Sequence, residues 1–189
     1  MKKLTILTIF LSLLGVSFAQ DLDGITGEGK TKDGVKVGKW TYVCDSTGKE
    51  VGVERYDGDG KLHGYQTWYS CDGYRISEYN YEHGVKMGTQ KDYYEYGNRL
   101  KREWSLIEQP KKCKNAYGDK GKATIESYKE YFSNGKVMIE MKGDPCGKRM
   151  ITKNRPSGGQ EWTIRYDDQG QWIDGPRIQE QEIFSQDLY

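Results

Sequence analysis

Apolar and aromatic residues recur along this chain in short runs that alternate with polar residues, and glycine-containing turns separate the runs. Aromatic runs lead into candidate turns at residues 72–73, 96–97, 134–135 and 169–170. Two of these turns are Asp-Gly and Asn-Gly, pairs that favour the positive φ angles of tight hairpins. The second strands are expected at residues 74–81, 98–104 and 136–141. The pattern therefore predicts successive β-hairpins, each with one core-facing and one solvent-facing side.

This hairpin unit repeats. Three units open with glycines four residues apart, at 34 and 38, 60 and 64, and 84 and 88. The second glycines of these pairs are 26 and 24 residues apart. We expect each Gly-xxx-Gly segment to be the loop that reverses the chain into the next hairpin. A fourth unit spans 128–136 and a weaker fifth spans 162–175.

A tyrosine precedes the turn glycine by four residues in four of the units, at Tyr69, Tyr93, Tyr131 and Tyr166. Because one hairpin is marginally stable in water, the units must stack and share a core. The sequence thus predicts an all-β protein, with stacked hairpins in one long antiparallel sheet. We expect the tyrosine series to lie on one face of that sheet, towards the core.

The repeat resembles the MORN-repeat superfamily (membrane occupation and recognition nexus), and its bacterial variant known as the YwqK-family antitoxin-like repeat. The residues that carry the resemblance are Gly84 with Gly88, the run Tyr-Tyr-Glu-Tyr-Gly at 93–97, and the run Tyr-Phe-Ser-Asn-Gly-Lys at 131–136. The resemblance covers roughly residues 30–150, with a weaker continuation to about 175. It implies an elongated, twisted antiparallel sheet of MORN-like hairpins that serves as a binding platform.

The first residues have the composition of a secretory signal peptide. Lys2 and Lys3 form a basic start, residues 4–18 are mostly apolar, and Ser17 and Ala19 suit cleavage before Gln20. An apolar stretch of this length is short for a membrane span, which needs about 20 residues. We therefore expect a secreted or periplasmic protein with no membrane span in the mature chain.

The four cysteines are an even set, which in an oxidising compartment indicates two disulfides. Three pairings of Cys44, Cys71, Cys113 and Cys146 are possible. Matching strands of successive hairpins lie about 9.5 Å apart, whereas a disulfide needs Cα atoms within about 7 Å. Cys44 and Cys71 can therefore bond only if their turns lean together. We favour Cys44–Cys71 and Cys113–Cys146 from sequence proximity, with free buried thiols as the alternative.

Composition and charge restrict the function. The chain of 189 residues has 24 glycines and 15 tyrosines, which suits short strands and a thin aromatic core rather than a large α/β enzyme core. Lys plus Arg number 29 and Asp plus Glu 28, and loss of Lys2 and Lys3 with the leader leaves a net charge of −1. This balance gives no electrostatic drive towards nucleic acid or an anionic membrane.

The chain divides into six segments. These are the signal peptide at 1–19, a lead-in at 20–33, repeats 1–3 at 34–104, an insertion at 105–124, degenerate repeats 4–5 at 125–175 and a C-terminal tail at 176–189. The insertion is interpreted as a surface loop, or as a basic flap held by Cys113. The tail is expected to be a capping strand, a short helix or a frayed end.

Residue types that carry chemistry do not form a recognisable motif. His63 and His83 each precede a repeat glycine and are interpreted as loop histidines. The pair Asp57 and Asp59 does not continue into an EF-hand, because position 12 of that loop would be Gln66. Glutamates on the expected strands, which suggest a solvated face, are Glu78, Glu103, Glu126, Glu140 and Glu161. We therefore expect no catalytic residue, no metal site and no cofactor.

Without a recognisable catalytic motif, the sequence points to a binding surface as the source of function. Tyrosine and tryptophan are rigid amphipathic residues that are enriched at interfaces. The leading hypothesis is an exported, non-catalytic platform that binds a protein partner. Carbohydrate or envelope-polymer binding is the first alternative, and a small enzyme with an unrecognised site is the second. Trp68 and Tyr94 are the candidate contact residues, because each is offset by one position from the tyrosine series and should face the opposite way.

Overall fold

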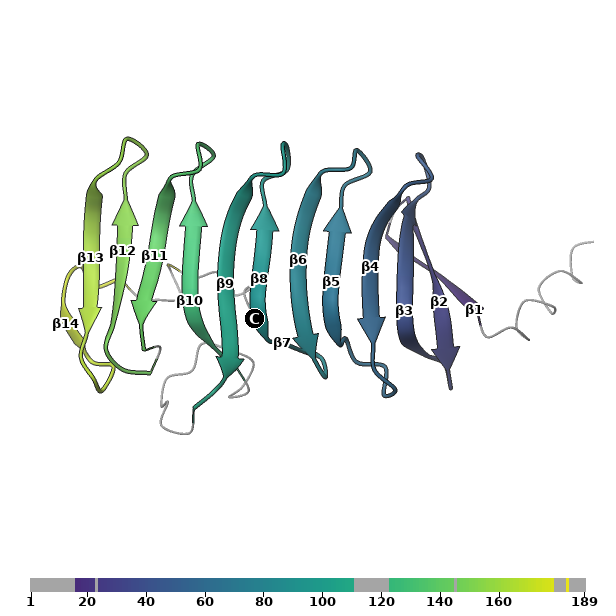
Figure 1. The fold of residues 1–189 in the computed structure, drawn as a ribbon, viewed down its shortest axis with the longest axis horizontal. Helices are drawn as coiled ribbons and strands as arrows, with labels where there is room; N and C mark the ends of the chain where they lie inside the picture. The colour runs from purple at the N-terminus through teal and green to yellow at the C-terminus, as the bar shows by residue number, and fades with distance from the viewer. Residues whose placement is uncertain (1–15, 23, 111–122, 145, 179–182, 184–189) are drawn as a thin grey trace, which may run out of the picture.

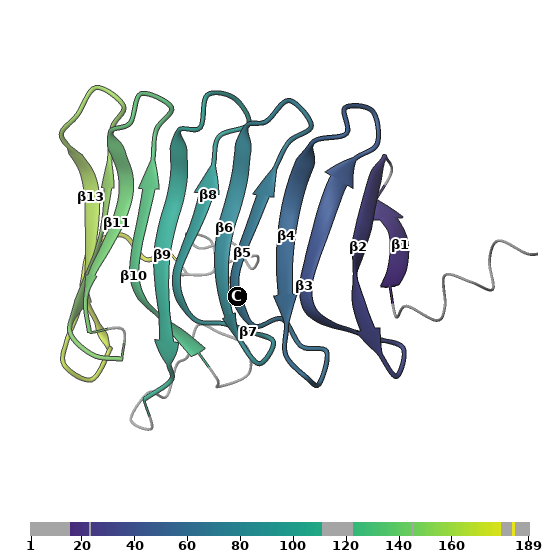
Figure 2. The same cartoon turned by 45° about the vertical axis from the view of Figure 1, so that its right-hand side comes forward.

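The computed structural model describes residues 16–22, 24–110, 123–144, 146–178 and 183 of the chain. These residues form an open antiparallel sheet in which the strands follow one another in chain order from β1 to β14. The short strand β7 is off this path and pairs only with β6, which also pairs with β8. Figures 1 and 2 show the strands side by side along the long axis of a twisted sheet. The predicted all-β architecture of stacked hairpins is confirmed.

The strands are short, as the glycine spacing predicts. The first seven are β1 (Val16–Leu22), β2 (Ile25–Lys32), β3 (Val35–Cys44), β4 (Glu50–Tyr56), β5 (Gly64–Tyr69), β6 (Arg75–Glu82) and β7 (Val85–Lys86). The others are β8 (Gly88–Tyr93), β9 (Leu100–Glu108), β10 (Ala123–Tyr131), β11 (Val137–Gly143), β12 (Arg149–Asn154), β13 (Gln160–Tyr166) and β14 (Trp172–Asp174). None of the described residues belongs to a helix that is both long and apolar enough to cross a membrane.

The turns lie in two rows, one at each end of the strands (Figure 1). We call the row that contains residues 70–74 the upper edge and the row that contains residues 57–63 the lower edge. Glycines 73, 97 and 135 all have positive φ, between 83° and 92°, as their predicted turn positions require. A β-branched residue would be strained there.

The Gly-xxx-Gly segment at 60–64 lies in the loop between β4 and β5, as expected, but the segments at 34–38 and 84–88 run from a turn into a strand. The first glycine of each pair lies in a turn, as where Asp33 and Gly34 join β2 to β3 with positive φ at both residues. The second glycine lies in or at the start of the next strand, as Gly64 and Gly88 do. The expected lead-in at 20–33 is therefore largely strand β2, the first strand of a hairpin. The expected insertion is also shorter, because β9 extends to Glu108 and β10 begins at Ala123.

The fifth repeat is out of phase with the others. Strands β5, β8 and β10 end at Tyr69, Tyr93 and Tyr131 and lead into upper-edge turns, whereas β13 ends at Tyr166 and leads into a lower-edge turn (Figure 1). The upper-edge turn that continues the true period is 155–159, closed by a hydrogen bond from Arg155 N to Gly159 O. Tyr166 is consequently buried in the core, and the tyrosine series does not share one face.

The two faces of the sheet differ in burial. The core face presents two clusters of buried side chains, one built on Trp40 and Tyr42 and one built on Trp104, Ile151 and Ile164. Ile178 and Ile183 from the C-terminal segment pack against the second cluster. The opposite face, which we call the open face, carries Tyr65, Glu103, Lys129, Met150 and Arg165.

Glycines make room for the aromatic rings of the N-terminal core. Each of Gly27, Gly29 and Gly52 is the cross-strand partner of an aromatic residue, respectively Tyr42, Trp40 and Trp68. A Cβ atom at any of the three glycines would lie within 2.6 Å of the facing ring. The rings therefore lie directly on the backbone of the neighbouring strand, which helps the sheet to bury large side chains.

Two buried glutamines repair interruptions in the strand pairing. Ladder pairing between β4 and β5, and between β6 and β8, is limited to two residue pairs each. At the first gap Gln66 accepts from Arg55 N and donates to Arg55 O, and at the second Gln90 does the same with Asn80. Both side chains are at most 2% exposed. Each amide thus satisfies backbone groups that the ladder leaves unpaired.

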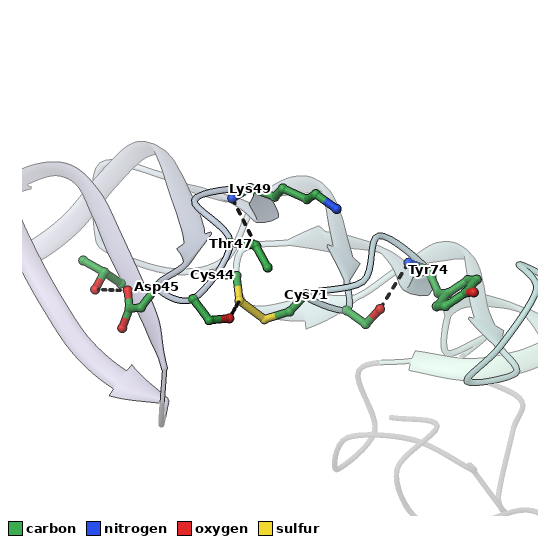
Figure 3. The surroundings of a disulfide bond; sticks show 9 residues. Cys44, Asp45, Thr47, Lys49, Cys71 and Tyr74 are labelled. Carbon is green, nitrogen blue, oxygen red and sulfur yellow. Dashed lines mark hydrogen bonds between the residues drawn. A yellow bond between two sulfur atoms is a disulfide. The ribbon is translucent and has the colours of Figure 1, made fainter.

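The disulfide Cys44–Cys71 is present, and it joins the upper-edge turns of the first two hairpins (Figure 3). The Cα atoms are 5.6 Å apart, so the turns lean together as the bond requires. A hydrogen bond from Thr26 Oγ1 to Asp45 Oδ1 adds a contact from β2 at the same place. Cys146 is also disulfide-bonded, but Cys113 lies outside the described residues, and the pairing of these two stays a prediction.

The expected cleavage point falls inside a strand. Strand β1 pairs with β2 from Val16↔Lys30 to Leu22↔Ile25, and the bond between Ala19 and Gln20 lies in the middle of this ladder. Cleavage there would remove the ladder partners of residues 27–30 of β2. Residues 1–15, which contain most of the expected leader, are outside the described residues.

Candidate binding surface

A group of aromatic and charged side chains gathers on the open face over β5, β6 and β8. We call it the Arg75 cluster, and its members are Tyr65, Tyr69, Arg75, Glu78 and Tyr93. The register places Tyr65 and Glu78 on the opposite side of the sheet from Gln66 and Ser77, which are buried on the core face. The Tyr65 side chain is 46% exposed, so the cluster reaches solvent.

Arg75 and Glu78 organise the cluster. The Arg75 guanidinium lies 5.3 Å from the ring centre of Tyr93 and 5.9 Å from that of Tyr69, within range of cation–π attraction. Its Nη1 atom forms an ion pair of 2.9 Å with Glu78 Oε1. The Tyr93 hydroxyl donates to Glu78 Oε2 at 3.0 Å. These contacts hold the two rings in fixed positions around a charged pair.

The electrostatics follow from these contacts. Partial burial, together with a hydrogen bond to Glu78, raises the pKa of Tyr65 to about 12. Partial burial likewise raises the pKa of Tyr93. The phenol groups of Tyr65 and Tyr93, neutral at physiological pH like ordinary tyrosines, keep their protons to higher pH and can both donate and accept hydrogen bonds. The cluster thus offers aromatic surface, neutral hydroxyls and one cation–carboxylate pair side by side.

A hollow of about 400 Å³ lies on the open face over β8 to β11, and Lys91, the cross-strand partner of Glu78, forms an ion pair with Glu103 in its lining. Polar side chains line it, including Glu103, Glu126 and Glu140. Each of these carboxylates has a partner: Lys91 lies 3.7 Å from Glu103, Lys142 lies 2.8 Å from Glu140, and Ser105 donates to Glu126 at 3.2 Å. The acids are thus members of ion pairs and hydrogen bonds, as expected for a solvated face.

The predicted orientation of Trp68 is wrong. Trp68 packs on the core face against Tyr42, with ring centres 4.7 Å apart, and its ring lies over Gly52. Tyr69 and Tyr93 are the residues on the open face. Neighbouring residues do face opposite ways, as alternation predicts, but the assumption that the tyrosine series faces the core reversed the two sides.

Tyr94 is a turn residue with a structural contact. Its hydroxyl donates to the carbonyl of Tyr131 at 2.6 Å, which ties the upper-edge turn after β8 to the turn after β10. Burial raises the pKa of this hydroxyl. The structure therefore does not place Tyr94 with Trp68 on a shared surface.

Sequence reasoning missed Tyr65 and Arg75. The sequence does contain a signal that fixes the faces, because Gln66 and Gln90 each come two residues after a repeat glycine. A glutamine that recurs at this position indicates a buried backbone-binding role, which would have placed Tyr65 on the other side. Arg75 also recurs, since it comes two residues after Gly73 and Arg99 comes two residues after Gly97, but this repetition does not indicate which face the side chain takes.

Comparison with known proteins does not identify the chain. No protein-family model matches the sequence, and no curated protein matches it.

Proposed function

We propose that this protein is a non-catalytic, MORN-like repeat scaffold that binds a protein partner through the Arg75 cluster and the adjoining hollow. The observation that supports the proposal is the gathering of Tyr65, Tyr69 and Tyr93 around Arg75 on the face that does not carry the core. The opposite face is occupied by its own aromatic core and by Ile178 and Ile183.

The chemistry of the cluster suits a binding centre. Tyrosine and arginine are enriched among the residues that contribute most to protein–protein affinity. The contacts that Arg75 makes with Glu78 and Tyr93 hold the rings before a partner arrives, which lowers the entropy cost of binding. The hollow beside the cluster adds charged groups of both signs, which favour specificity over non-specific adhesion.

We also propose export to an oxidising compartment. The Cys44–Cys71 disulfide is typical of such compartments, and the signal-peptide pattern of residues 1–19 supports the same destination. Intact-mass analysis of the protein from its native compartment tests this proposal. A chain that begins at Gln20 supports cleavage, and a mass that retains residues 1–19 contradicts it.

Partner capture with matched variants tests the binding function. Immobilised protein is exposed to an envelope extract of the cell that produces it, and Tyr65→Ala and Tyr93→Ala are compared with Tyr96→Ala. Tyr96 is 63% exposed but lies in an upper-edge turn, so its variant removes the same side chain from another surface. We expect the first two variants to lose a partner that wild type and Tyr96→Ala retain. Equal capture by all four proteins contradicts the proposal.

Carbohydrate binding is a second candidate for the same cluster. Sugar recognition needs aromatic rings with hydrogen-bonding groups beside them, and Arg75 and Glu78 lie beside the rings of Tyr69 and Tyr93. Calorimetric titration with soluble oligosaccharides from the envelope polymer tests this candidate. Saturable binding that Tyr93→Ala abolishes supports it, and the absence of any heat of binding rejects it.

A further inference from the structure

The chain contains only two histidines, and the fold brings them together at the lower edge of the sheet. His63 ends the loop between β4 and β5, and His83 lies in the turn between β6 and β7. Their ring centres are 5.0 Å apart. Asp57, which follows β4 directly, completes a group whose possible ligand atoms all lie within 4.8 Å of one another.

We propose that Asp57, His63 and His83 form a binding site for a divalent transition-metal ion of the zinc class. Two imidazoles and one carboxylate are a ligand set that suits Zn²⁺, with the remaining coordination positions taken by water. This site is distinct from the Arg75 cluster, which lies on the open face of the sheet, and it does not depend on the proposed binding function.

Backbone contacts hold the two histidine-bearing segments next to each other. Gly84 N donates to Leu62 O at 2.8 Å, which joins the His83 turn to the His63 loop. His63 N donates to Arg55 O at 2.8 Å. His83 and Gly84 both have positive φ, 48° and 86°, as a tight hairpin turn requires. The relative position of the two imidazoles is thus set by the stacking of successive repeats.

Hydrogen bonds from the turn backbone hold the Asp57 carboxyl group in place. Its Oδ1 atom accepts from Asp59 N at 3.0 Å and from Lys61 N at 2.9 Å, while Oδ2 faces His83 Nδ1 at 2.8 Å. One carboxylate oxygen therefore shapes the turn and the other is directed at the histidines.

The remaining adjustment for metal binding is small. Ligand atoms about 2.1 Å from a tetrahedral Zn²⁺ are separated by about 3.4 Å. The His83 side chain is 71% exposed, so its ring can rotate by the small amount that this closure needs. His63 Nδ1 accepts a hydrogen bond from His83 N at 3.4 Å, and Zn²⁺ would replace this long hydrogen bond when it binds that nitrogen. The metal would replace the hydrogen bond between His83 Nδ1 and Asp57 Oδ2.

The test is a Zn²⁺ titration of the untagged protein, followed by calorimetry and by proton NMR of the histidine Cε1 protons. Because there are only two histidines, both signals can be followed individually. We expect one Zn²⁺ per chain, with both signals shifting together. His83→Asn removes one ligand while keeping a residue that tolerates positive φ, and we expect it to weaken binding by roughly tenfold or more.

A second aspartate provides the matched control. Asp167 forms the same turn as Asp57, with Oδ1 accepting from Gln169 N and Gln171 N, but without a histidine ion pair. Asp57→Asn should weaken Zn²⁺ binding, and Asp167→Asn should leave it unchanged. The inference is overturned if wild type shows no saturable Zn²⁺ binding, if only one histidine signal shifts, or if Asp57→Asn binds as tightly as Asp167→Asn.

Discussion

The ring of Trp40 lies flat against the backbone of Gly29, its cross-strand partner, so that a Cβ atom at position 29 would be 2.5 Å from three ring carbons. The indole Nε1 donates to the carbonyl of the next residue, Lys30, at 3.0 Å. Trp40 is therefore fixed both by contact and by a hydrogen bond. This arrangement explains how the sheet buries the Trp40 side chain almost completely.

Gly29→Ala should destabilise the protein by about 1–3 kcal/mol, because the added methyl group must displace the Trp40 ring. Gly58→Ala is the control, since position 58 has open space for a Cβ and no positive φ. Urea unfolding followed by tryptophan fluorescence measures both variants. Equal midpoints for the two proteins would show that the ring does not rest on Gly29.

Gln90→Leu should cost about 2–4 kcal/mol of unfolding free energy. The leucine keeps the approximate volume but leaves the amide and carbonyl of Asn80 without their buried partner. Gln169→Leu changes an exposed glutamine in a turn and should be nearly neutral. A Gln90→Leu protein with wild-type stability would contradict the role of this amide in bridging β6 and β8.

Replacing Cys44 and Cys71 together by alanine should lower the unfolding free energy by roughly 3.5 kcal/mol. The estimate is the chain entropy of closing a loop of this size, given that the two residues are 27 apart. Chemical denaturation of the double variant under non-reducing conditions measures the loss and leaves other disulfides intact. An unchanged midpoint would mean that the bond contributes nothing to the folded state.

Stability should fall as the pH rises above about 10. Burial first, and then hydrogen bonding to Glu54, raise the pKa of Tyr42 and Tyr56 on the core face, and burial with a hydrogen bond to Asp92 raises that of Tyr79. Because the pKa of these phenols is higher in the folded than in the unfolded protein, the unfolded chain loses its tyrosine protons at a lower pH. The stabilisation is therefore complete below the ordinary tyrosine pKa and is lost above it.

Phenolate absorbance recorded together with circular dichroism tests this dependence on pH. Part of the absorbance change should coincide with unfolding, and Tyr42→Phe should move the unfolding transition to higher pH. Titration of all 15 tyrosines near pH 10 with the fold intact would contradict it.

The sequence predicted the local structure well, because turns depend on a few residues with special backbone freedom. Gly73, Gly97 and Gly135 occupy the predicted turns, and Cys44 bonds to Cys71. The sequence predicted loops at 34–38 and 84–88, whereas the turns there are short and the second glycine of each pair, Gly38 or Gly88, lies in a strand. A turn glycine and a strand glycine recur with the same spacing, so spacing alone does not tell which glycine is in the turn.

The assignment of faces could not be made from alternation alone. Register shifts occur between Trp68 and Tyr69 and between Asp92 and Tyr93, at the ends of β5 and β8. The extra residues at these shifts lie in the partner strands β6 and β9, so side chains still alternate along β5 and β8, but alternation does not tell which of the two faces is the core. The residues of the proposed metal site were also separated in the sequence, because Asp57, His63 and His83 meet only once β5 and β6 fold back between them. Such contacts across repeats leave no short motif in the sequence.

Site-specific photo-cross-linking tests the central claim, that the Arg75 cluster is the binding surface, most directly. A photoreactive phenylalanine analogue replaces Tyr65 in one protein and Tyr96 in another, and both are irradiated in the cell that produces the chain. Both positions are exposed tyrosines, so the analogue should be tolerated at each. We predict a discrete cross-linked protein from position 65 that is absent from position 96. Cross-linking from position 96 alone, or from neither position, would contradict the account.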